Sequence, residues 1–212
     1  MKFEEARRIL LVGAGSHGRV VLDLLRDLGV ESRVAGFLDA VHSRTGEVEG
    51  VPLLGGPDDI EQLASQFDSV LLPIGDGVLR EQWAQTVRAA GLPLLTAIHP
   101  RSVISSRAFL EPGVMVSAGA IIVTGAQVGA SCIVNTGATI DHDCAIEGYA
   151  HICPGAHLAG CVQVGTRTMV GIGASVKQGV RIGADVRIGA GAAVVTDIPD
   201  GVTAVGVPAR WS

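Results

Sequence analysis

The chain has 212 residues, which is enough for two domains of about 100 residues each. Its 21 acidic and 16 basic side chains give a net charge of −5, which argues against nucleic acid as a partner. No apolar run approaches the roughly 20 residues of a membrane-spanning helix, and the opening sequence, MKFEEARRIL, lacks the apolar core of a signal peptide, so we expect a cytoplasmic protein with no membrane partner.

Residues 1–100 alternate apolar, strand-like runs with helical patterns. This alternation predicts βαβ units, and we therefore expect an α/β domain built on a parallel sheet. The strand-like runs are RILLVGAG at 8–15, RVAGFLD at 33–39, SVLLPIGD at 69–76 and LPLLTAIHP at 92–100, and the helical patterns cover 17–29 and 78–90.

The sequence GAGSHG at residues 13–18 closes the first strand and opens the first helix. Its glycines permit a tight turn, and amides at a helix N-terminus can face a phosphate. Asp39 ends the second strand 21 residues after Gly18, where it can accept a hydrogen bond from a ribose or sugar hydroxyl. A dinucleotide fold needs two such halves, so we expect one nucleotide and no nicotinamide cofactor. The alternative is that these glycines only shape a turn in a capping domain.

Every sixth residue from Ile104 to Val194 is aliphatic, and a compact residue lies four places after nearly every one of them. This repeat predicts a parallel β-helix, in which each short strand buries one aliphatic side chain and the compact residue allows the chain to turn a corner. Three hexapeptides make one triangular coil, so the repeats give about five coils. Any active site then lies on the outside of this prism, and residues 199–208 are expected to cover the last coil.

The densest polar cluster in the repeats is NTGATIDHDC at residues 135–144, followed by His151. Because Ile140 fills the interior, His142 is predicted to project outward from a corner with an aspartate on each side. A neutral imidazole can take a proton from an amine or a hydroxyl near pH 7, and a neighbouring carboxylate raises its basicity and fixes its tautomer. The alternative is an exposed histidine without a catalytic role.

Two other sets of residues are assigned no function. The remaining histidines lack a motif of this kind; they are His42, His99 and His157. The cysteines show no metal-ligand spacing, so we expect no metal; they are Cys132, Cys144, Cys153 and Cys161.

Taken together, these motifs resemble a family of hexapeptide-repeat acyltransferases, which includes the bacillosamine-pathway nucleotide-amino-sugar N-acetyltransferases and the sialic acid O-acetyltransferases. The resemblance covers nearly the whole chain. It implies a Rossmann-like nucleotide-sugar-binding domain over residues 1–100, followed by a left-handed β-helix acyltransferase domain with a C-terminal cap over residues 101–212. It rests on GAGSHG, FLD at 37–39, PIGD with Gly77 and Arg80 after it, IHP at 98–100, NTGATIDHDC, HICPGAHLAG at 151–160 and the closing GVPAR at 206–210.

The same resemblance implies roles for individual residues. It makes His142 the general base, Asp143 the carboxylate that heightens its basicity and Asn135 an active-site amide. Ala40 departs from the relatives, which have a second acidic residue there, and this leaves the nucleotide and the sugar open. The residues matched to acetyl-CoA contacts are His151, Gly171 and Ile172. The residues matched to nucleotide-sugar contacts are Gly15, Ser16, His17, Asp39 and Gly75.

The expected function is direct transfer of an acetyl group from acetyl-CoA to the amine of a nucleotide-linked amino sugar, in surface-glycan biosynthesis. The resemblance further implies a homotrimer with acetyl-CoA between adjacent subunits, no covalent acyl-enzyme and no metal. One alternative is a sialic acid type O-acetyltransferase, in which the first domain need not bind a nucleotide. A second alternative is a β-helix scaffold without catalysis, which would have no use for an aspartate-flanked histidine.

Overall fold

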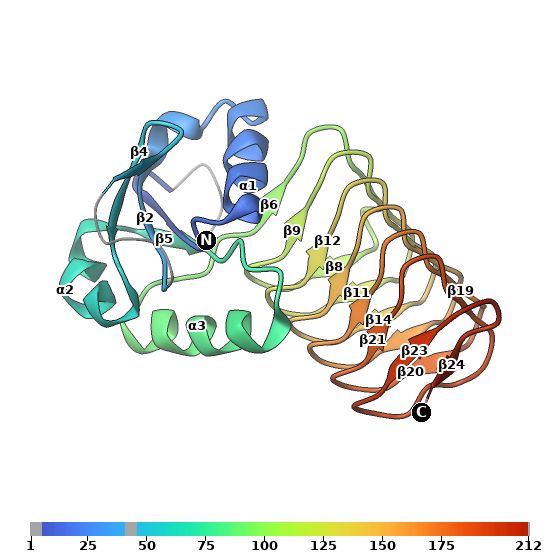
Figure 1. Ribbon diagram of the computed structural model, residues 1–212. Coiled ribbons are helices and arrows are strands. Elements are labelled where there is room, and N and C mark those ends of the chain that lie inside the picture. Colours follow the sequence, from blue (N-terminus) through green and yellow to red (C-terminus); the bar gives the residue numbers. More distant parts are fainter. Residues whose placement is uncertain (1–5, 41–45, 212) are drawn as a thin grey trace. The chain divides into compact units, whose positions relative to one another are not determined.

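The computed structural model of the chain describes residues 6–40 and 46–211. The chain divides into two compact units, Met1–His99 and Pro100–Ser212 (Figure 1). His42 lies outside the described residues. Among the helices of the described residues, none has the length and hydrophobicity that crossing a bilayer requires.

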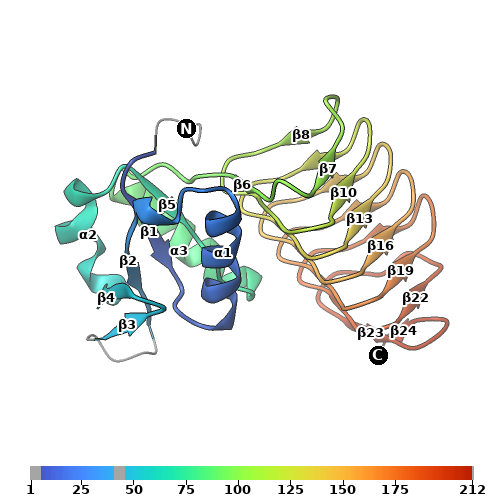
Figure 2. The same ribbon diagram turned by 90° about the horizontal axis from the view of Figure 1, so that it is seen from above.

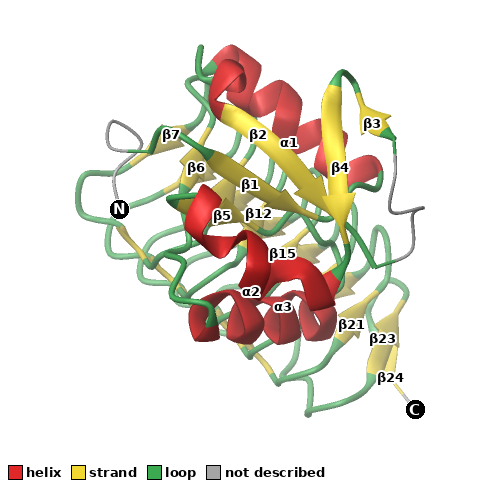
Figure 3. Cartoon of the chain, turned by 90° about the vertical axis from the view of Figure 1, so that its left-hand side faces the viewer, coloured by secondary structure: helices red, strands yellow, loops and turns green. Residues whose placement is uncertain are grey.

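The first unit is built on a five-stranded sheet with the order β3-β4-β2-β1-β5. β1 runs parallel to both β2 and β5, and only the edge strand β3 is antiparallel, to β4. Figure 3 shows α1 on one face of this sheet and α2 and α3 on the other. The strands of this sheet are β1 (Ile9–Val12), β2 (Val34–Leu38), β3 (Glu47–Val48), β4 (Val51–Gly55) and β5 (Ser69–Leu71). The short strand β6 (Ala97–Ile98), at the end of the unit, is not part of this sheet. The helices are α1 (Ser16–Asp27), α2 (Ile60–Leu63), α3 (Gly77–Ala89) and the 3-10 turns Glu31–Arg33, Pro57–Asp59 and Ala64–Gln66.

Amphipathic spacing explains why α1 packs on this sheet. Val21, Leu22, Leu24 and Leu25 recur three or four places apart and are buried, together with Gly18. All four residues of β1 are buried as well, which is expected for a central strand covered on both faces. The parallel α/β domain expected from the sequence is therefore confirmed.

The second unit is a left-handed β-helix with three flat faces (Figure 2). Each coil takes 18 residues, since Ile122 pairs with Ile140 and Ile140 pairs with Leu158. The first face holds β7 (Val103–Ile104), β10 (Ile121–Ile122), β13 (Thr139–Ile140), β16 (His157–Leu158), β19 (Ser175–Val176) and β22 (Ala193–Val194). The second face holds β8 (Phe109–Leu110), β11 (Gln127–Val128), β14 (Ala145–Ile146), β17 (Gln163–Val164) and β20 (Arg181–Ile182). The third face holds β9 (Met115–Val116), β12 (Ile133–Val134), β15 (His151–Ile152), β18 (Met169–Val170), β21 (Arg187–Ile188), β23 (Thr203–Val205) and β24 (Arg210–Trp211).

The six-residue register predicted from the sequence is confirmed. The aliphatic residues from Val116 through Val194 are buried in one continuous core, and the compact corner residues pack between them. Ile104 and Leu110, in the first coil, are only half-buried, because the end of a solenoid stacks on a single neighbouring coil. At the other end, β23 pairs in parallel with β21 and antiparallel with β24, so these two strands extend the third face and cover the strand edge of β21.

Candidate functional site

The turn between β1 and α1 is held tightly against the end of β2. The amide of Gly13 donates to the carbonyl of Leu38 at 2.8 Å, and the amide of Ala14 donates to Oδ2 of Asp39 at 2.6 Å. A β-carbon on Gly18 would overlap the carbonyl oxygen of Gly13, so the third glycine of GAGSHG is required by close packing. The turn therefore presents the start of α1, with its N-terminal backbone amides, beside a carboxylate.

A cavity of about 260 Å³ opens beside this turn. All five residues expected to contact a nucleotide sugar line it. The remaining wall is largely apolar, and the sequence analysis assigned no ligand contact to its members; they are Gly13, Ala40, Pro73, Ile74, Leu79 and Trp83. The cavity combines helix-terminal amides with an apolar wall, which suits a phosphorylated ligand with a flat or aliphatic part.

Arg80 anchors the far side of this cavity. Its side chain is fully buried and donates from Nη1 to the carbonyls of Ile74 and of Gly75, the latter at 3.1 Å. Burial, with the charge of Arg80 as a second cause, lowers the pKa of His17 to about 4. His17 is therefore neutral near pH 7, so it offers a hydrogen bond to a ligand and not a positive charge. The sequence motif contained Arg80 but gave no sign that it would be buried.

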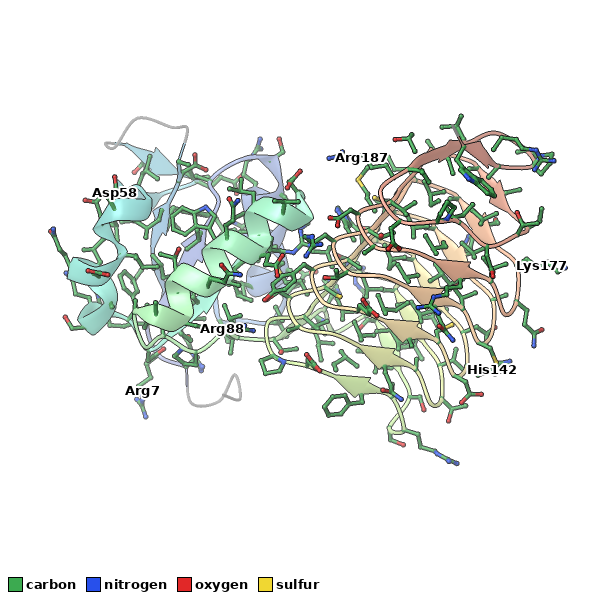
Figure 4. The ribbon with its side chains drawn as sticks, turned by 90° about the horizontal axis from the view of Figure 1, so that it is seen from below. Arg7, Asp58, Arg88, His142, Lys177 and Arg187 are labelled. Carbon is green, nitrogen blue, oxygen red and sulfur yellow. The ribbon has the colours of Figure 1, made fainter. Side chains whose placement is uncertain are left out.

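His142 stands on the edge of the prism where the chain turns from β13 on the first face to β14 on the second. Figure 4 shows it at the outer rim of the coils. Its side chain is 42% exposed, and Nδ1 lies 3.0 Å from Oδ2 of Asp143. Asp141 accepts a hydrogen bond from the backbone amide of His142 at 2.6 Å. The ring is thus accessible; Asp143 orients it, and Asp141 holds the backbone of the same residue.

These contacts change the acidity of the imidazole. The hydrogen bond with Asp143 is the main cause of a raised pKa for His142; partial desolvation opposes it, and the charges of Asp141 and Asp143 add to it. With Nδ1–H donated to Asp143, Nε2 carries no proton, so its lone pair can accept one. This is the geometry of a general base that is oriented by a carboxylate.

Glycines in the neighbouring coils make room for this pair. A β-carbon on Gly125 would overlap the carboxylate of Asp143, and a β-carbon on Gly160 would overlap Nε2 of His142. The space left by the missing β-carbon of Gly125 is occupied by Asp143, and that of Gly160 is occupied by His142. The sequence identified the histidine but not this requirement.

Asn135 and His151 meet each other on a different edge. Nδ2 of Asn135 lies 3.1 Å from Nε2 of His151, and Oδ1 of Asn135 accepts the amide of Thr136 at 2.8 Å. Asn135 follows β12 and precedes β13, so it occupies the corner between the third and first faces. Within one chain Asn135 is therefore one corner away from His142, and the two do not form a single cluster. The six-residue spacing explains this, because residues 135 and 142 fall in successive turns of the triangle.

A second cavity, of about 360 Å³, lies along this same edge. Gly171 and Ile172 line it, and His151 stands next to it because it pairs with Met169 in the register of β15 and β18. The cavity is largely apolar; Arg187 is among its lining residues, and Ile172 is 60% exposed. The other lining residues are Cys153, Met169, Ile188, Gly189, Ala190 and Thr203. An extended ligand with an apolar body and an anionic end would fit this surface.

The two other described histidines are held by structural contacts. Nε2 of His99 lies 2.8 Å from Oδ2 of Asp27 at the end of α1, and Nδ1 of His157 lies 3.0 Å from Oγ1 of Thr139 on the first face. Neither lines the cavities described above. The sequence assigned them no catalytic role, and these contacts give a structural reason for both.

Comparison with known proteins gives matches over both units. Residues 8–87 match the family described as the PglD N-terminal domain. A histidine-to-asparagine mutant of perosamine N-acetyltransferase from Caulobacter crescentus, solved with CoA and GDP-perosamine, is 40% identical, with a TM-score of 0.92 over 97% of this chain and 96% of its own. The acetyltransferase domain of PglB from Neisseria gonorrhoeae, solved with acetyl coenzyme A, is 35% identical, with a TM-score of 0.89 over 97% of this chain and 99% of its own. WeeI from Acinetobacter baumannii is 26% identical, with a TM-score of 0.86 over 97% and 99%.

Proposed function

Because this chain belongs to the family of hexapeptide-repeat sugar N-acetyltransferases, we propose that it transfers the acetyl group of acetyl-CoA to the amine of a nucleotide-linked amino sugar in surface-glycan biosynthesis. The observation that carries the proposal is the exposed imidazole of His142, hydrogen-bonded through Nδ1 to Asp143 at 3.0 Å. A family member without catalysis would not need an accessible, oriented base. Acetyl-CoA is a cytoplasmic metabolite, so the reaction is proposed to take place there.

In the proposed reaction, the amine nitrogen attacks the thioester carbonyl carbon while Nε2 of His142 takes the amine proton. The carbon–sulfur bond then breaks, the amide forms and coenzyme A leaves as the thiol after it receives that proton. Asp143 stabilises the imidazolium that exists between these two transfers, since the hydrogen bond between them favours the protonated ring. This sequence needs no acyl-enzyme and no metal.

We assign the donor to the edge that holds Asn135, His151, Gly171 and Ile172. The apolar cavity of about 360 Å³ suits the pantetheine arm, and Arg187 among its lining residues suits a phosphate. We assign the acceptor to the cavity at the start of α1, where Gly15, Ser16, His17, Asp39 and Gly75 converge. Helix-terminal amides there suit the diphosphate of a nucleotide sugar.

We propose a homotrimer, and the positions of these groups on the prism support it. The base occupies the corner between the first and second faces, whereas the proposed donor edge is the corner between the third and first faces. Within one chain, acetyl-CoA bound at that edge would have to extend across a whole face of the prism to bring its acetyl group to His142. If the donor edge of one subunit lies against the His142 edge of the next, a three-fold ring completes three identical sites.

Transfer to nitrogen is favoured over transfer to a sugar hydroxyl, because an N-acetyltransferase acting on GDP-perosamine is 40% identical to this chain over nearly its whole length. The sialic acid type O-acetyltransferase remains the second candidate. The two differ in whether the first unit must bind a nucleotide.

The decisive experiment measures acetyl transfer from acetyl-CoA to a panel of UDP-, GDP- and dTDP-linked amino sugars. We expect one nucleotide class to be acetylated on nitrogen, and we expect His142→Ala to lower kcat about 100- to 10,000-fold with the fold intact. His157→Ala is the matched control, because His157 is also an exposed histidine on the prism, and it should retain near wild-type turnover. More than about a tenth of wild-type turnover in His142→Ala would contradict the assignment of the base.

A further inference from the structure

Three metal-binding side chains meet on the edge that carries His142. One ring nitrogen of His142, one carboxylate oxygen of Asp143 and Sγ of Cys161 lie within 4.8 Å of one another. Cys161 comes 18 residues after Asp143, which is one full coil, and its amide donates to the carbonyl of His142 at 2.9 Å. The β-helix thus assembles a set of ligands that are far apart in sequence.

We propose that His142, Asp143 and Cys161 form a binding site for a divalent transition-metal ion of the zinc type, and that this ion switches the enzyme off. Imidazole, thiolate and carboxylate are the ligands that zinc takes from proteins, whereas Mg²⁺ and Ca²⁺ prefer oxygen ligands alone. The ion is an inhibitor in this proposal and not a cofactor.

The distances are close to those of a tetrahedral site. Zinc bond lengths place pairs of ligand atoms about 3.3–3.6 Å apart, so a pair separated by 4.8 Å must close by about 1.2–1.5 Å. Nδ1 of His142 and Oδ2 of Asp143 are already 3.0 Å apart. Asp143 and Cys161 are both exposed, so their side chains can turn toward the ion without loss of packing.

The charge around the site favours a dication. Asp143 contributes one negative charge, and Cys161 contributes a second when its thiol proton is displaced by the metal. The charge of Asp141 also acts on His142, although its carboxylate is not among the three ligands. A fourth coordination position remains for water, as in zinc sites that are not closed by protein.

Inhibition rests on the proposed function, in which Nε2 of His142 takes the substrate proton. An ion on Nδ1 replaces the proton shared with Asp143, and the neutral ring then carries its proton on Nε2, where no second proton can be accepted. An ion on Nε2 occupies the lone pair directly. Either geometry removes the base, and displacement of the thiol releases one proton to solvent.

The site is tested first without any activity measurement, by titration of the purified, metal-free protein with Co²⁺. Ligation by a thiolate gives a sulfur-to-cobalt charge-transfer band in the near ultraviolet, and Zn²⁺ should displace it. Cys161→Ser should abolish the band. Cys132→Ala is the matched control, because it removes a buried thiol at a corner position that alanine fills in other coils, and it should keep the band. No band in the wild type, or an equal band in Cys161→Ser, would overturn the site.

Inhibition is tested second, by initial rates at zinc concentrations set with a metal buffer, because free coenzyme A itself binds zinc. We expect zinc to inhibit the wild type reversibly, Mg²⁺ to have no effect, and Cys161→Ser to need at least about 10-fold more zinc for the same inhibition, with unchanged activity in chelator. Equal zinc sensitivity of the two proteins would overturn the switch. A cobalt band that depends on Cys161, together with zinc-insensitive turnover, would keep the site and count against His142 as the base.

Discussion

The imidazole of His142 lies against the α-carbon of Gly160 in the next coil, so closely that a β-carbon there would overlap Nε2. The backbone of Gly160 is not in the left-handed region, so the coil itself would accept an alanine at this position. The requirement for glycine comes from the histidine ring. Gly160 is therefore a positioning residue for the proposed base.

Gly160→Ala is expected to push the ring away and to break the 3.0 Å hydrogen bond between His142 and Asp143. Because a misplacement of about 1 Å can cost 100-fold, kcat should fall by about 100-fold. The pKa of His142 should fall toward the ordinary value, which a titration of its ring protons by NMR can follow. In Gly148→Ala, the matched control, the new β-carbon would make only ordinary contacts, 3.4 Å or more, and both quantities should stay unchanged. Unchanged turnover and pKa in Gly160→Ala would refute this role.

Asp143→Asn tests how the pH dependence arises. Asparagine tolerates the left-handed backbone of residue 143, where φ is 57°, so the shape of the corner is kept while the charge is lost. In the wild type the hydrogen bond with Asp143 raises the pKa of His142. As the pH falls, the ring is therefore protonated, and activity is lost, at a higher pH than for an ordinary histidine. In the variant the acid limb of kcat/KM should move to lower pH, and the plateau should fall because the imidazolium is less stabilised. An acid limb that stays in place or moves to higher pH contradicts the coupling.

The β-helix could be predicted from the sequence because every hexapeptide carries its own aliphatic residue, so the period can be read directly along the chain. The burial of Ile122, Ile140 and Leu158 follows from their spacing alone, and every coil repeats the same pattern. The small α/β domain was predictable for a similar reason, since strand and helix periods alternate. Its antiparallel edge strand β3 has only two residues and left no such period.

The sites were only partly predictable, because they depend on contacts between coils. His142 and Asp143 are adjacent in sequence, and their pairing was foreseen. The contacts with Gly160 and Cys161 come from the coil that follows, and no local motif records them. The separation of Asn135 from His142 was missed although the six-residue repeat contains it, since seven residues in sequence cross from one corner to the next.

Ile140→Asp and Thr139→Asp form a matched pair that tests the register. Ile140 is fully buried, whereas Thr139 faces outward and its hydroxyl meets His157 at 3.0 Å. A buried, unpaired carboxylate costs several kcal/mol, comparable with the stability of a whole domain. Thermal unfolding should therefore show a large loss of stability for Ile140→Asp and a small one for Thr139→Asp. Equal losses would mean that the inward and outward positions have been exchanged.

Substitution of Asp39 tests whether the proposed acceptor site is distinct from the proposed donor site. Its Oδ2 accepts the amide of Ala14 at 2.6 Å, and its carboxylate also lines the cavity at the start of α1. Asp39→Ala removes both contributions. The KM for the nucleotide sugar should rise about 10- to 100-fold, which corresponds to roughly 1.5–3 kcal/mol, while the KM for acetyl-CoA stays nearly unchanged.

Asp39→Asn distinguishes a ligand contact from a role in shaping the turn. The asparagine oxygen can still accept the amide of Ala14, but its NH₂ group cannot accept a hydroxyl proton from the sugar or the ribose. If Asp39 binds the ligand directly, Asp39→Asn should raise the KM for the nucleotide sugar nearly as much as Asp39→Ala does. A wild-type KM in Asp39→Asn beside a raised one in Asp39→Ala would restrict Asp39 to shaping the turn. An unchanged KM in both variants would contradict nucleotide-sugar binding in this cavity and would favour the O-acetyltransferase, whose sugar binds on the prism alone.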